Sequence, residues 1–226
     1  MTTLSYKIGF WSALLLTLSF IVWIVCFIGI AFASPLFYWT NINDYLIYSQ
    51  ANNQILQYIA KFFMLLFGPL YVLLINSYYE YANDDKKVLV RISLLFGLAF
   101  AILSSLHYFV QLSAVRLNIK LGQLEGLVNF IQANPNSIMT SIDMLGWTLF
   151  LGLSSFFISP IFRGDRQNKI IHYTFICNGL SCILGGIGYV FQIDIMTFIF
   201  INLGVGGAIL ALSIASMKLF NRLKTI

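Results

Sequence analysis

Three ionisable side chains lie within otherwise apolar stretches of the sequence: Lys61, His107 and Asp143. A charge inside a membrane is costly and is usually retained for a function. An aspartate beside a histidine can orient the imidazole as a general base or proton relay. The same residues could instead hold the polar head of a ligand, or form a buried polar cluster that fixes helix packing. The sequence leaves these three interpretations open.

The composition indicates that these stretches lie in lipid. The chain has 226 residues, of which 59% are hydrophobic and only 9% charged, whereas soluble domains carry about 25% charged residues. All three cysteines lie in apolar runs, as small buried hydrophobic residues do. The net charge of +5 comes from basic residues beside the apolar runs rather than from a basic cluster with interleaved aromatic residues. We therefore exclude nucleic-acid binding.

Six segments contain the roughly 20 apolar residues that a membrane-spanning helix needs. The first apolar run is longer than the hydrophobic part of a secretory signal, which is about 7–15 residues, so we expect a retained span. The sequence therefore predicts an all-α, six-helix membrane bundle that forms one domain. The predicted spans are approximately 10–33, 55–78, 90–114, 138–161, 170–191 and 195–217.

The basic residues predict the orientation of the bundle. If the N-terminus lies inside, only Arg116 and Lys120 fall in outer segments, and Lys61 falls within a span. Cytoplasmic segments carry an excess of Lys and Arg, so both termini are predicted to be cytoplasmic, in a multi-pass protein of the cell membrane. The other ten of the thirteen basic residues are inner: Lys7, Lys86, Lys87, Arg91, Arg163, Arg166, Lys169, Lys218, Arg222 and Lys224.

Counting along each helix places the polar residues at similar depths. At a rise of 1.5 Å per residue, Lys61 lies ~9 Å, His107 ~8 Å and Asp143 ~10 Å to the outer side of the membrane midplane. Asn202 lies ~6 Å out on the same side. Because chain direction alternates between spans, sequence position does not impose this agreement. It predicts one polar site near the outer surface.

The third span adds a polar stripe. Ser104, His107 and Gln111 are spaced i, i+3 and i+7, so they share one helix face. Arg116 lies a little over one turn beyond Gln111. We expect this face to point into the bundle, because lipid would penalise it. The candidate ligand-binding set is Lys61, Ser104, His107, Gln111, Arg116, Asp143 and Asn202.

An outer segment at 120–133 carries apolar residues at helical spacing, with polar residues between them. The pattern predicts a short amphipathic helix. Such a helix could rest on the membrane surface, or it could cover a cavity that opens outward. Both interpretations remain open from the sequence.

Motifs of known catalytic chemistry are absent from the sequence. It contains no His-Glu-x-x-His, no phosphate-binding loop and no Gly-x-Ser-x-Gly. No cluster of His, Cys and carboxylates has the spacing of metal ligands. The second histidine, His172, lies ~20 Å from His107 along the membrane normal, so the two cannot ligate one haem. We expect no metal and no cofactor, and we favour a role other than catalysis.

The third and fourth spans resemble a group of uncharacterised bacterial six-span integral membrane proteins. The similarity lies in His107 to Ser113, in Glu125-Gly126-Leu127, in Asn134 to Ile138 and in Leu145-Gly146-Trp147, and it covers roughly residues 90–165. The resemblance implies a bacterial multi-pass protein without an assigned activity. Members of the group often have Asn at the position of His107, which implies hydrogen bonding centred on Gln111 rather than chemistry that needs an imidazole.

Together these observations predict a protein that binds or transports a small amphiphile or lipid in an outward-facing polar pocket, with membrane lipids as its surroundings. One alternative is a membrane-embedded enzyme that uses His107 and Asp143 as an acid–base pair. The other is a non-catalytic structural or partner subunit. A ligand site requires a cavity beside the polar residues, whereas a structural cluster would be fully packed.

Overall fold

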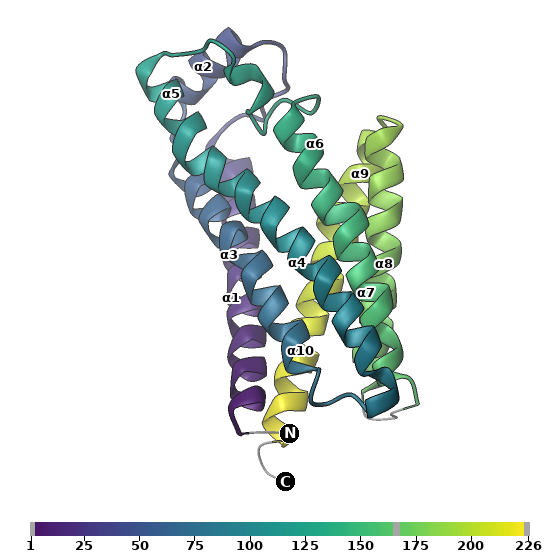
Figure 1. Ribbon diagram of the computed structural model, residues 1–226. Helices are drawn as coiled ribbons and strands as arrows, with labels where there is room; N and C mark the ends of the chain where they lie inside the picture. The colour runs from purple at the N-terminus through teal and green to yellow at the C-terminus, as the bar shows by residue number, and fades with distance from the viewer. Residues whose placement is uncertain (1–2, 165–167, 224–226) are drawn as a thin grey trace.

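The computed structural model describes residues 3–164 and 168–223 and contains only helices, turns and loops in this part of the chain (Figure 1). Six of its helical segments are long and apolar enough to cross a membrane. The predicted six-span bundle is therefore confirmed, and the chain is a multi-pass membrane protein. The spans are Leu4–Ala33, Ile55–Ser77, Asp84–Leu121, Ile138–Phe162, Lys169–Val190 and Asp194–Leu223.

Several spans consist of more than one helical segment. The first, second and fifth are the single helices α1 (Thr3–Ala33), α3 (Ile55–Ser77) and α8 (Lys169–Val190). The third joins η1 (Asp84–Lys86), α4 (Lys87–Val110), η2 (Gln111–Val115) and α5 (Arg116–Leu121). The fourth joins α6 (Ile138–Leu145), η4 (Gly146–Phe150), α7 (Leu151–Ile158) and η5 (Ser159–Phe162). The sixth joins α9 (Asp194–Phe198), η6 (Ile199–Val205) and α10 (Gly206–Leu223).

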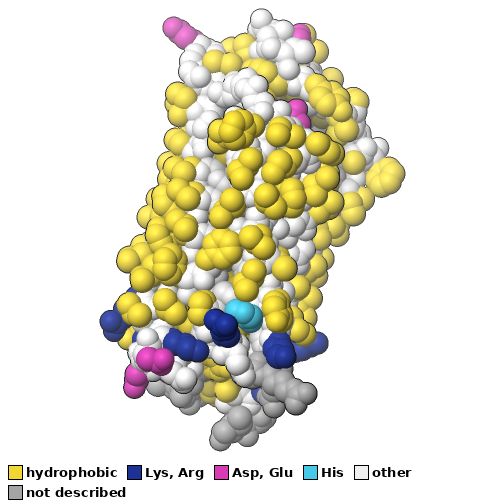
Figure 2. Space-filling view, turned by 90° about the vertical axis from the view of Figure 1, so that its right-hand side faces the viewer, with side chains coloured by type: hydrophobic (Ala, Val, Ile, Leu, Met, Phe, Trp, Pro, Cys, Tyr) yellow, Lys and Arg dark blue, Asp and Glu magenta, His cyan; other side chains and the backbone are white. Residues whose placement is uncertain are grey.

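The two ends of the bundle differ in charge, and in the described part of the chain only one of them is covered by a further helix. α1 begins and α10 ends at one end of the bundle, which we call the terminal end, and α2 (Ile42–Ala51) lies at the other, which we call the capped end (Figure 1). Lys and Arg side chains gather around the terminal end below a broad apolar surface (Figure 2). This is the distribution expected from the charge pattern, although Arg166 and Lys224 lie outside the described residues.

Buried hydroxyl groups join the spans toward the terminal end. The Ser93 hydroxyl donates to the Ser154 carbonyl at 2.7 Å, and the Ser154 hydroxyl donates to the Ser93 carbonyl at 2.8 Å. The Tyr71 hydroxyl lies 3.0 Å from Ser154 Oγ, and Thr17 donates to Ser213 Oγ at 2.8 Å. Small residues and interhelical hydrogen bonds hold membrane helices together where no hydrophobic effect acts between them. These contacts fix one half of the bundle.

Gly68 allows α3 and α4 to approach closely. A Cβ atom at this position would lie 2.7 Å from Ala101 Cα, which belongs to the backbone of α4 and cannot rotate away. We therefore expect Gly68→Ala to lower the free energy of unfolding by about 1–3 kcal/mol, as overpacking typically does. Thermal unfolding in detergent would measure the change. Gly207→Ala is the matched control, because nothing lies within 4 Å of its added Cβ; equal effects of the two substitutions would contradict this account.

A separate cap covers the opposite end of the bundle. It comprises residues 34–54, which contain α2, and residues 122–137. A small core joins the cap to the third span: it consists of Tyr45, Leu127 and Ile131 of the cap and Val115 of η2. Asn41 caps α2 by accepting a hydrogen bond from the Asp44 backbone at 3.0 Å, an arrangement that favours helix initiation. α2 was not predicted from the sequence.

The helix predicted over 120–133 is wrong as one continuous element. α5 ends at Leu121, and Gly122 and Gly126 both have φ of 69°, a left-handed conformation that glycine adopts readily. Only a single 3₁₀ turn follows, η3 (Leu127–Asn129). The apolar spacing was nevertheless informative, because Leu127 and Ile131 are buried in the core of the cap.

Candidate functional site

Three spans change from α-helical to π-helical hydrogen bonding in the half of the bundle nearer the cap. The π-helical segments are η2, η4 and η6. Such turns are rare and occur frequently at functional sites, because the extra residue in the turn changes which side chains face inward. Gln111 begins η2, Asp143 lies three residues before η4, and Asn202 lies within η6. The candidate site is therefore built around three local distortions of otherwise regular helices.

His107 and Asp143, which were predicted to lie at one depth, also lie beside each other across the bundle. His107 Nε2 lies 3.8 Å from Asp143 Oδ2, and His107 Nδ1 lies 3.2 Å from the Met139 carbonyl. The 3.8 Å separation exceeds hydrogen-bond length, and within the described part of the chain neither His107 Nε2 nor Asp143 Oδ1 has a hydrogen-bond partner. His107 is completely buried. The pair is thus an enclosed polar contact with unused hydrogen-bonding capacity.

Asp143 lines a cavity of about 330 Å³ between the spans. Polar groups come from Asp143, Thr140, Asn202 and Gln132, on α6, η6 and the cap. The volume lies in the range of about 300–1,000 Å³ typical of small-molecule sites. The rest of the wall is mainly aromatic and aliphatic: Phe20, Trp23, Phe27, Met64, Phe67, Tyr108, Met144, Trp147, Ile201, Val205, Gly206 and Ile209.

Lys61 lines a second cavity of about 240 Å³ immediately beside the first. Lys61 has no hydrogen-bond or ion-pair partner among the described residues. Tyr45 of the cap also lines this cavity; burial raises the pKa of Tyr45 to about 12, so its phenol stays neutral at physiological pH. Five residues line both cavities: Trp23, Phe27, Met64, Tyr108 and Gln132. Lys61 and Asp143 thus lie on the walls of two adjoining cavities.

Gln111 has a positioning role rather than a place on the cavity wall. Its side-chain amide donates to the Phe130 carbonyl, and its oxygen accepts from the Gln132 backbone at 3.1 Å. Both ends of the side chain are therefore used to hold the cap segment against the third span. This contact fixes Gln132, whose side chain lines both cavities.

The remaining predicted site residues are placed differently from one another. Asn202 lines the Asp143 cavity and also a wider hollow of about 950 Å³ beside it, so it lies at the wall between them. Ser104 is fully buried with an unpaired hydroxyl but lines neither cavity. Arg116 is exposed, where its guanidinium lies 5.8 Å from the Tyr58 ring centre. The structure therefore brings together Lys61, Asp143 and Asn202, with His107 and Gln111 behind the wall.

Several cavity residues were not singled out in the sequence analysis. Gln132 lies in the segment 120–133, which was predicted to be one helix. That prediction did not indicate that Gln132 faces the inside of the bundle. Trp23, Tyr108 and Trp147 occur in apolar runs where aromatic residues are common. No local sequence signal distinguishes these aromatic residues from those that face lipid. Their position depends on how the spans diverge near the cap.

The fold and site define a class of protein: a multi-pass membrane protein with adjoining cavities of mixed polarity near one end of its spans. No group of three or more His, Cys, Asp or Glu side chains that could hold a metal ion occurs among the described residues. Comparison with protein-family models, with curated proteins and with solved structures finds no match to the chain.

Proposed function

We propose that the protein binds or transports a small amphiphile or lipid in the adjoining cavities. The terminal end lies on the cytoplasmic side of the cell membrane, in keeping with its many basic residues. The cavities then lie toward the outer leaflet beneath the cap. The polar head offers an acceptor to Lys61 and a donor to Asp143, while its apolar part lies among Trp23, Phe27 and Trp147.

One observation carries this proposal: polar groups without a full set of hydrogen bonds lie beside unfilled cavities. Among the residues that the structure describes, Lys61 has no hydrogen-bond or ion-pair partner and Asp143 Oδ1 has no hydrogen bond. Uncompensated polar groups in a membrane interior cost free energy. A ligand with a complementary head would satisfy both groups and fill the cavities.

The same geometry gives less support to the two other functions. An enzyme using His107 as a base requires substrate to reach the imidazole, but His107 is completely buried and lines neither cavity. A purely structural cluster would be packed without a void, whereas Asp143 adjoins about 330 Å³ of space. Ligand binding accounts for both the polar groups and the space beside them.

A substitution that occupies the cavity tests this proposal. Asn202 lines the cavity, and among the described residues its side chain makes one hydrogen bond, a donation at 3.1 Å to the Phe198 carbonyl of its own span. We expect Asn202→Phe to weaken retention of the amphiphile that co-purifies with the protein by roughly 5- to 150-fold, because steric overlap costs about 1–3 kcal/mol. Solvent extraction of protein purified in mild detergent, followed by mass spectrometry, would measure the loss.

Leu203→Phe is the matched control for this experiment. Leu203 is the next residue on the same helix and is 63% exposed on the outer surface of the bundle. The Leu203→Phe variant should retain the amphiphile at the wild-type level. Equal retention by the wild type and by both variants would contradict the proposal.

A further inference from the structure

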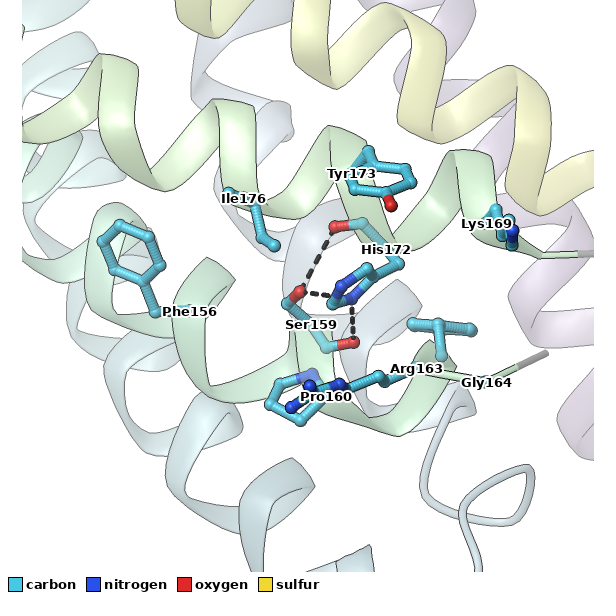
Figure 3. Close-up of a pocket in the computed structure, with 10 residues that line it drawn as sticks. Phe156, Ser159, Pro160, Arg163, Gly164, Lys169, His172, Tyr173 and Ile176 are labelled. Carbon is cyan, nitrogen blue, oxygen red and sulfur yellow. Dashed lines mark hydrogen bonds between the residues drawn. The ribbon is translucent and has the colours of Figure 1, made fainter. Parts of the chain in front are cut away.

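A second hollow, of about 500 Å³, lies at the terminal end between the end of the fourth span and the start of α8 (Figure 3). It is separate from the cavities beneath the cap and shares none of their lining residues. Arg163, Gly164 and Lys169 line its polar side. Phe156 and Ile176 line it further along the spans and supply an apolar wall.

His172 and Ser159 form a rigid link across this hollow. His172 Nδ1 lies 2.9 Å from the Ser159 carbonyl, so it carries the hydrogen and donates it, and it also lies 2.8 Å from Ser159 Oγ. The Ser159 hydroxyl in turn donates to the His172 carbonyl at 3.2 Å. Figure 3 shows these contacts between the two helices. The link fixes the spacing of the elements that carry Arg163 and Lys169, and only His172 Nε2 remains for a further contact.

The cations beside the hollow are available for a ligand. Arg163 and Lys169 are exposed, and neither has a hydrogen-bond or ion-pair partner among the described residues. A third cation, Lys86, donates to the carbonyl of Pro160 at 3.2 Å, and Pro160 itself lines the hollow. Two cationic side chains therefore line the hollow beside its apolar residues, and a third cation is bound to the backbone of one lining residue.

We propose that this hollow binds an anionic phospholipid. Its phosphate lies between Arg163 and Lys169, and one acyl chain follows Phe156 and Ile176 along the spans. Basic pockets between spans on the cytoplasmic side bind anionic lipid head groups, and the apolar wall favours a lipid over free phosphate. The site is independent of the cavities beneath the cap.

Lipid binding to the intact protein tests this assignment. The probes are phosphatidylglycerol, phosphatidylcholine and inorganic phosphate, each titrated against detergent-purified protein and followed by native mass spectrometry. We expect the wild type to prefer phosphatidylglycerol to phosphatidylcholine. The double variant Arg163→Ala, Lys169→Ala should bind phosphatidylglycerol roughly 30-fold more weakly, since each interfacial cation contributes appreciably to anionic lipid binding.

The control variant is Lys7→Ala, Lys218→Ala, which removes the same charge at the terminal end from residues outside the hollow. It should bind phosphatidylglycerol as the wild type does. An equal loss in both double variants would overturn the site, because it would show a response to net charge alone. Displacement of the lipid by millimolar phosphate would overturn the assignment to a lipid. Thermal unfolding of each variant confirms that the protein remains folded.

Discussion

Replacing Lys61 with methionine should stabilise the ligand-free protein. Methionine has a similar length but no charge, and Lys61 lies within a membrane span without a hydrogen-bond or ion-pair partner in the described structure. Insertion measurements put the cost of a lysine at a span centre at about 2.5–3.5 kcal/mol. We expect Lys61→Met to raise the free energy of unfolding by about 2 kcal/mol, with part of the full cost already relieved by the adjoining cavity. Thermal unfolding after removal of co-purifying lipid would measure this.

This prediction separates a binding site from a packing cluster. A lysine retained for a ligand costs stability when the ligand is absent, so its removal stabilises the protein and weakens binding. A lysine retained for packing would give the opposite result, a lower unfolding temperature with no change in binding. Lys120→Met is the control, because Lys120 is exposed on α5 and should have little effect.

Replacing Gln111 with leucine should release the cap from the third span. The substitution removes the hydrogen bonds to the Phe130 carbonyl and from the Gln132 backbone. Each such bond contributes about 0.5–1.5 kcal/mol, so the cap segment 122–137 should open roughly 5- to 150-fold more often. Hydrogen exchange followed by mass spectrometry should show faster exchange in this segment. Exchange near the Ser93–Ser154 contact should stay at the wild-type rate.

Gln123→Leu provides the comparison for this variant. Gln123 is an exposed glutamine of the same cap segment, and its substitution leaves the Gln111 contacts intact. Its exchange should match that of the wild type. Unchanged exchange in Gln111→Leu would contradict the positioning role assigned to Gln111, and so would an increase spread evenly over all spans.

The six spans could be predicted from sequence because their cause is local. A helix that crosses lipid must satisfy its own backbone hydrogen bonds over about 20 apolar residues, and the loops between the spans are polar. The second predicted span, 55–78, agrees closely with α3, Ile55–Ser77. The first and third spans begin earlier than predicted, at Leu4 rather than near residue 10 and at Asp84 rather than near residue 90, because polar residues can extend a helix beyond the membrane.

The site could be predicted only in part. Counting residues along each helix placed His107 and Asp143 at one depth, and they lie 3.8 Å apart. Lateral position is not contained in such a count, so Arg116 was included although it lies on the exterior. The π-helical turns also change which residues face inward, and the predicted regular helices did not include them.

The cap shows where tertiary contacts outweigh a local pattern. Residues 120–133 have helical spacing, but Gly122 and Gly126 adopt left-handed conformations and interrupt the helix. Leu127 and Ile131 then enter a core that Tyr45, from a distant part of the chain, completes. The glycines were a signal against a continuous helix, since glycine lowers helix stability by about 1 kcal/mol relative to alanine.

The central claim is that the adjoining cavities near Lys61 and Asp143 hold an amphiphile, and native mass spectrometry of the intact protein tests it most directly. We predict that wild-type protein released from mild detergent carries one bound amphiphile per chain, and that the double variant Lys61→Met, Asp143→Asn carries none while remaining folded. A wild type that shows only the mass of the polypeptide in every mild detergent would contradict the claim. So would a double variant that retains the same bound molecule at the wild-type level.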